Sequence, residues 1–177
     1  MDPNQLANIG AALSLSAFMP YAWAVLRGSA RPQRSSWLIW SVLSSVALAA
    51  VIASGGTQGL AFTASQTGGT AAIFLMSLWR GTGSLYNRAD GSILAASAVG
   101  IGLWLFTDNP AYAMALSIGI GAMGGSLTVV KAYRFPASEA MGPWVLQMTA
   151  AGFGVASVIG ATALEMAYPI YLLALYA

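Results

Sequence analysis

The sequence predicts an all-α membrane protein with seven transmembrane helices, on the basis of its composition, its apolar stretches and its charge placement. Of the 177 residues, 58% are hydrophobic and only 7% are charged, whereas a soluble domain carries about a quarter charged residues. So small a supply of charge cannot cover a surface exposed to water. We therefore expect lipid to surround most of the chain.

Seven apolar stretches approach the length of a spanning helix, which needs roughly 20 mostly apolar residues. Turn signals such as Gly55-Gly56 and Asn109-Pro110 separate them. The predicted helices cover residues 6–26, 36–54, 58–79, 92–107, 111–130, 142–160 and 162–177. The fourth and seventh are short, and we expect interfacial residues or a thin local bilayer to accommodate them.

All seven basic residues fall in alternate loops of this arrangement. They are Arg27, Arg31 and Arg34 after the first helix, Arg80 and Arg88 after the third, and Lys131 and Arg134 after the fifth. Basic residues concentrate in cytoplasmic loops. The distribution therefore predicts an outside N-terminus and a cytoplasmic C-terminus.

A shift of 104 residues lays the second half of the chain over the first. The aligned landmarks are Arg27 with Lys131, Pro32 with Pro136 and Trp40 with Trp144. The shift pairs helices one to three with helices five to seven and leaves the fourth alone, a 3+1+3 parallel repeat. We therefore predict a first bundle at 1–80, a linker with the fourth helix at 81–108, and a second bundle at 109–177.

The layout and the run "RPQRSSWLIW", which contains Pro32-Gln33, resemble the SWEET and PQ-loop transporters. The chain is more closely similar to a group of uncharacterised bacterial seven-helix proteins of that layout. The resemblance implies a carrier for a small solute, sugars included, that works by alternating access. The apolar stretches hold no carboxylate in mid-span, which favours a uniporter over proton-coupled transport. The resemblance also implies hinge or gate prolines, which here are Pro20, Pro32, Pro136 and Pro143. The family's pair of Asn residues in helices three and seven is missing.

Polar side chains at membrane depth are costly and therefore indicate function. Gln66 lies near the middle of the third stretch, one turn after Thr63, and Gln147 lies within the sixth. Their neutral amides both donate and accept, which suits a hydroxylated or zwitterionic solute. The alternative is a hydrogen bond between helices, without any ligand. In the last helix, Tyr171 is a further candidate contact to substrate.

The related residues Trp40 and Trp144 lie slightly inside the cytoplasmic ends of their helices. Their indoles are suited to stack on a sugar ring or to close a gate. The alternative is anchoring at the membrane interface. We assign that anchoring to Trp37, which is nearer the loop.

The sequence contains no Cys and no His, which excludes thiolate nucleophiles, His-based acid–base chemistry and zinc sites built from those side chains. We therefore expect no enzyme, no cofactor and no metal. The expected partners are the lipid bilayer and a small polar solute, not nucleic acid, and a homo-oligomer stays open. Short loops favour a bacterial inner membrane.

Two other functions stay open: a membrane receptor that does not transport, and a helical subunit of a larger membrane complex. A polar cavity lined by Gln66, Gln147 and Trp40 would favour the carrier. A dry bundle with a groove of small residues on its outside would favour the subunit.

Overall fold

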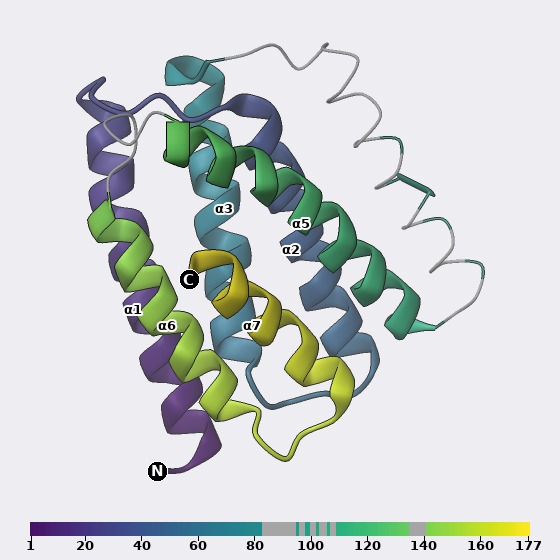
Figure 1. Ribbon diagram of the computed structural model, residues 1–177. Helices are drawn as coiled ribbons and strands as arrows, with labels where there is room; N and C mark the ends of the chain where they lie inside the picture. The colour runs from purple at the N-terminus through teal and green to yellow at the C-terminus, as the bar shows by residue number, and fades with distance from the viewer. Residues whose placement is uncertain (83–94, 96–97, 100–101, 103–105, 107–108, 135–140) are drawn as a thin grey trace.

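The computed structural model describes residues 1–82, 95, 98–99, 102, 106, 109–134 and 141–177 (Figure 1). Six helices run through the described residues, and each has a counterpart among the predicted stretches. They are α1 (Pro3–Leu26), α2 (Arg34–Ala53), α3 (Leu60–Arg80), α5 (Pro110–Arg134), α6 (Met141–Ser157) and α7 (Ala163–Tyr176). For the described residues, the prediction of an all-helical fold is confirmed.

Capping residues in the sequence account for several helix boundaries. At the start of α1, the backbone N–H of Asp2 donates to Gln5 Oε1 at 3.3 Å. At the start of α7, Glu165 N–H donates to Thr162 Oγ1 at 3.3 Å, and Thr162 N–H donates to Glu165 Oε2 at 3.2 Å. This reciprocal pair satisfies N–H groups that a helix start leaves without partners. Gly28 follows α1 with φ 76°, a conformation that glycine adopts without strain.

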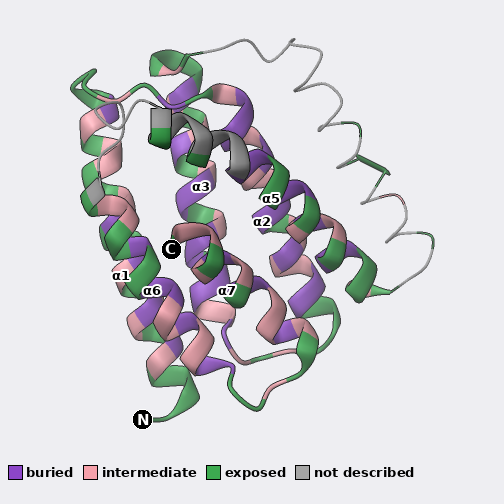
Figure 2. Cartoon of the chain, in the orientation of Figure 1, coloured by how far each residue is buried: buried purple, intermediate pink, exposed green. Residues whose placement is uncertain are grey.

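The helices form two layers that face each other. In the first layer, α3 packs against α1 and α2, and in the second, α7 packs against α5 and α6. Across the two layers, α6 lies along α1 and α5 lies along α2 (Figure 1). Buried residues lie mainly where the helices face one another, whereas the outward parts of the helices carry exposed residues (Figure 2). Any site between the layers is therefore built from helices far apart in the sequence.

Small residues bring the two layers close together where α1 meets α6. A Cβ added to Gly10 would lie 3.1 Å from the carbonyl oxygen of Ala150, and one added to Gly154 would lie 2.6 Å from the Phe62 ring. Phe62 is fully buried and belongs to the main core cluster, with Met114 among others. Glycine therefore lets these helices approach while the aromatic ring of α3 fills the space between them.

The prediction of seven membrane-spanning helices is wrong. Among the described residues, two helices are both long and apolar enough to cross a membrane, α1 and α2, and α7 is a shorter apolar helix. Both long apolar helices lie near the N-terminus, where membrane anchors and signal sequences also carry such helices. The predicted fourth helix, 92–107, lies mostly outside the described residues. The 3+1+3 arrangement and the orientation of the termini depend on that count and are not supported.

Helix length and polarity explain the difference for α3, α6 and α7. The 17 residues of α6 and the 14 of α7 are about 26 and 21 Å long at 1.5 Å per residue. An apolar bilayer core is roughly 30 Å thick. In α3, buried Thr63, Ser65, Gln66 and Thr70 occupy the interior face and reduce its apolar character.

Replacement of Glu165 by alanine is expected to destabilise the bundle. Besides capping α7, the carboxylate accepts the backbone N–H of Gln58 at 3.2 Å, and so joins α7 to the loop between α2 and α3. Its loss leaves part-buried donors without partners, so we expect the free energy of unfolding to fall by about 1–3 kcal/mol. Thermal unfolding in detergent measures the change, with Thr149→Ala on an exposed face as control. Equal stability of Glu165→Ala and wild type would contradict this role.

Candidate functional site

A cavity of about 50 Å³ lies between the two layers, and all six described helices contribute to its wall. Eight of its 18 lining residues are aromatic. The polar lining comes from glutamine, serine, threonine and tyrosine side chains, and none of the lining residues, all from described helices, carries a charge. The cavity is therefore suited to an uncharged molecule that makes both hydrogen bonds and ring contacts.

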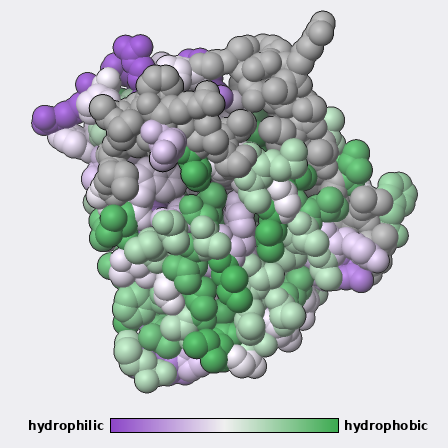
Figure 3. Space-filling view, viewed as in Figure 1, coloured by the Kyte–Doolittle hydropathy of each residue, from purple (hydrophilic) through white to green (hydrophobic). Residues whose placement is uncertain are grey.

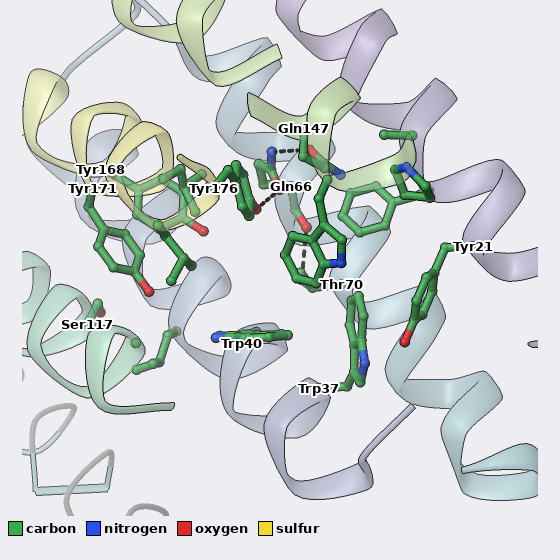
Figure 4. A pocket seen from close by; sticks show the side chains of 18 residues that line it. Tyr21, Trp37, Trp40, Gln66, Thr70, Ser117, Gln147, Tyr168, Tyr171 and Tyr176 are labelled. Atoms are coloured by element: carbon green, nitrogen blue, oxygen red, sulfur yellow. Dashed lines mark hydrogen bonds between the residues drawn. The ribbon is translucent and has the colours of Figure 1, made fainter. Parts of the chain in front are cut away.

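Two buried glutamines form the polar centre of this cavity (Figure 4). Gln66 is fully buried on α3 and Gln147 is 6% exposed on α6. Gln66 Nε2 donates to Gln147 Oε1 at 3.0 Å, and Gln66 Oε1 accepts from the hydroxyl of Tyr176 at 3.3 Å. These bonds join α3 of the first layer to α6 and α7 of the second. A neutral amide of this kind is tolerated in a low-dielectric interior because it is hydrogen-bonded.

Hydroxyl groups on α2 and α3 continue the polar strip beside Gln66. Thr70 Oγ1 donates to the carbonyl oxygen of Gln66 at 2.8 Å, and it lies 3.0 Å from Ser44 Oγ. Thr67 Oγ1 donates to the carbonyl oxygen of Ser44 at 3.0 Å. The strip therefore fixes α2 against α3 at the depth of the cavity.

Aromatic rings form the side of the cavity next to α1 and α2. Trp37 and Trp40 meet edge to face with ring centroids 5.3 Å apart, and Tyr21 lies 5.3 Å from Trp37 on its other side. Trp37 is 8% exposed and lines the cavity, so its assignment as an interfacial anchor is wrong. Residues three apart on a helix share a face. The three-residue spacing in the sequence therefore puts Trp37 and Trp40 on the same face of α2.

The structure brings together most of the predicted substrate contacts. Gln66, Gln147, Trp40, Trp144 and Tyr171 line the cavity. Trp40 packs against Trp37, whereas Trp144 packs on Tyr176 with centroids 5.9 Å apart. The remaining candidate, Thr63, is buried on α3 outside the lining. Their role in binding substrate stays a prediction.

The predicted hinge prolines occupy different settings. Pro20 is exposed within α1, and Pro143 lines the cavity in the first turn of α6. Pro32 is buried, and its carbonyl oxygen accepts the N–H of Thr82 at 2.9 Å. Pro136 lies outside the described residues. Motion at these prolines stays a prediction.

Several lining residues were missed by the sequence analysis. They are Phe18, Tyr21, Thr70, Ser117, Tyr168 and Tyr176. Tyrosines near helix ends occur where interfacial anchors are expected. Their position in the sequence therefore does not separate those that face the interior from those at the membrane interface. Phe18 lies one turn after Ser14 on α1, and only the structure shows that this part of the helix is buried. Pro169 is buried inside α7, which continues through it.

Comparison with protein-family models, with curated proteins and with solved structures yields no match. The resemblance to SWEET and PQ-loop transporters therefore stays an expectation based on sequence.

Replacing both amides of the Gln66–Gln147 pair is expected to destabilise the protein by less than the sum of the two single replacements. Gln66→Leu leaves Gln147 Oε1 and the Tyr176 hydroxyl without these partners, which costs about 1–3 kcal/mol. The double variant Gln66→Leu with Gln147→Leu leaves fewer polar atoms unpaired. A double-mutant cycle of unfolding free energies measures the coupling. Strictly additive losses would show that the amides act independently.

Proposed function

We propose that this bundle is embedded in a membrane and carries a small, uncharged polar solute through it by uniport. Its binding site is the cavity between the two layers, with Gln66 and Gln147 at its centre. The observation that carries the proposal is an uncharged, largely apolar cavity between the two layers, with a few buried hydrogen-bonding groups on its wall. Large apolar side chains are exposed on the outside of the described helices.

Exposed apolar side chains on the helix surfaces support the membrane location. Trp23 is 56% exposed, Ile52 59% and Leu75 55%. Hydrophobic residues cover the middle of the face seen in Figure 3, and hydrophilic ones lie toward its edges. Apolar surface on this scale marks contact with lipid or with another protein. The finer location that we propose is a bacterial inner membrane.

Charged side chains of the described residues support the same location by lying at the two ends of the bundle. Arg27, Arg31, Arg34 and Arg80 lie where α1 and α3 end and α2 begins. Asp2 precedes α1 at the other end, and Glu165 lies there in the first turn of α7. The middle of the bundle is left without charge, as an apolar bilayer core requires.

The character of the cavity favours a carrier over an assembly subunit. A subunit that only packs against partners has no need of buried amides around a space, because each such group must find a hydrogen-bond partner. Here the space is bounded by both layers, so relative movement of the layers is a route by which it opens to either side. The exposed apolar surface fits a carrier and a complex subunit equally well. The cavity fits the carrier better than the subunit.

Uptake into proteoliposomes tests this function. Vesicles shrunk in hyperosmotic acetamide, urea or glycerol swell again as solute enters, and light scattering measures the rate. We expect faster swelling with the protein than without it for at least one of the three, without dependence on a proton gradient. Ala17→Phe, which fills the cavity wall at a 1% exposed position, is expected to abolish the gain.

Ala12→Phe on the same helix points outward and serves as the matched control. Both variants are first checked for a monodisperse, helical state. Swelling at the protein-free rate for all three solutes with folded wild-type protein would overturn the carrier. Equal swelling rates for Ala17→Phe and wild type would show that the solute does not pass through this cavity.

A further inference from the structure

Three residues that line the cavity carry buried polar atoms without a hydrogen-bond partner. They are Trp40 Nε1 on α2, Ser117 Oγ on α5 and the hydroxyl of Tyr171 on α7. Ser117 is only 2% exposed. Buried polar atoms are nearly always hydrogen-bonded, so each exception calls for a cause. The described residues hold five such atoms, and three of the five lie on this cavity wall, which points to a shared cause for those three.

These atoms converge on one face of α5. A Cβ added to Gly121 would lie 2.5 Å from the Tyr171 hydroxyl, and one added to Gly124 would lie 3.8 Å from Trp40 Nε1. Positions 117, 121 and 124 are spaced by four and three residues and therefore share a helix face. Figure 4 shows the indole nitrogen of Trp40 on the side of the ring that faces Ser117 and Tyr171. Because glycine has no side chain, positions 121 and 124 leave space beside α5 for the Tyr171 hydroxyl and the Trp40 indole.

The Ser117 hydroxyl differs from those of buried Ser65 and Ser157. It shares its lack of a hydrogen-bond partner with buried Ser14, which lies outside the cavity lining. Ser65 and Ser157 each donate to a backbone carbonyl three residues earlier in their own helix, at 2.6 and 2.7 Å. That local bond is the usual way for a serine within a helix to satisfy its hydroxyl. Ser117 makes no such bond and lies open to the cavity. Its hydroxyl is thus available to a molecule inside.

The chemistry of the three atoms defines what they can bind. The indole N–H only donates, and both hydroxyls can donate as well. Together they match an oxygen that accepts hydrogen bonds. A carboxylate or phosphate would enter without a cationic side chain on the cavity wall, and a buried charge without a partner is strongly disfavoured. The matching group is therefore an oxygen of an uncharged molecule.

We propose that Trp40, Ser117 and Tyr171 form a donor site that binds the carbonyl oxygen of a small uncharged molecule, such as a carboxamide. This names the substrate class of the proposed carrier and rests on that function. The cavity of about 50 Å³ has room for about three to five water molecules, at about 10–15 Å³ each on this measure. Acetamide is of that size. The Gln66–Gln147 pair lines the same cavity.

Ligand-dependent unfolding of the full chain in detergent tests the donor site. Acetamide is the probe, and acetate is its charged counterpart of nearly the same shape. We expect acetamide to raise the unfolding temperature in a saturable way, and acetate to have no effect. Tyr171→Phe and Ser117→Ala are each expected to weaken the response by about tenfold, the loss of one hydrogen bond. Tyr112→Phe and Ser16→Ala, with exposed side chains, are expected to respond like wild type.

The stability of the variants without acetamide separates a ligand site from a structural role. Replacing an unpartnered buried hydroxyl by apolar atoms leaves the protein as stable as wild type or more stable. A marked fall in the unfolding temperature of both variants without acetamide would show that the hydroxyls hold the fold, and would overturn the proposal. So would an unchanged acetamide response in both variants, an equal response to acetate, or no response of wild type.

The outcome for the donor site is distinguishable from that for the carrier. If wild type transports acetamide and both variants transport it at the same rate, the carrier stands and the donor site is wrong. If wild type does not transport any of the probes but acetamide stabilises it and not the variants, the donor site stands and the carrier is wrong.

Discussion

The hydrogen bond between Gln66 and Gln147 is the contact on which the interior of this protein depends. It joins α3 to α6 across the two layers at 3.0 Å, and Tyr176 from α7 completes the acceptor side of Gln66. Buried amides in a low-dielectric interior must be paired, because an unpaired one carries the full cost of desolvation. The pairing fixes the register of the layers and holds polar groups around an open space.

Around that centre, the wall of the cavity separates into two kinds of surface. Next to α1 and α2, Tyr21, Trp37 and Trp40 contact one another and form an aromatic side. Along α5, the glycines at 121 and 124 leave space that neighbouring side chains enter from α7 and α2. Aromatic rings supply contact area with few rotatable bonds, and small residues supply room. The cavity therefore keeps its shape without charged groups.

The difference between the predicted and the observed fold has a physical origin in α3, α6 and α7. The predicted apolar stretches include turn residues that do not belong to the helices, such as Gly160. The observed helices α6 and α7 are therefore shorter than the apolar core of a bilayer is thick. Trp37 is a second example. The frequency of tryptophan at membrane interfaces predicted an anchor, whereas its three-residue spacing from Trp40 placed both rings on the same face of α2.

The sequence by itself determined that the chain is helical, where most helices begin and end, and which uncharged polar residues lie within apolar stretches. These features are local, since capping, glycine turns and hydropathy act over a few residues. Only the tertiary structure decided that Gln66 bonds to Gln147, 81 residues away, and that Trp40, Ser117 and Tyr171 meet at one face of α5. Such meetings depend on which helix faces are packed together, and a single sequence does not specify that packing through any local rule.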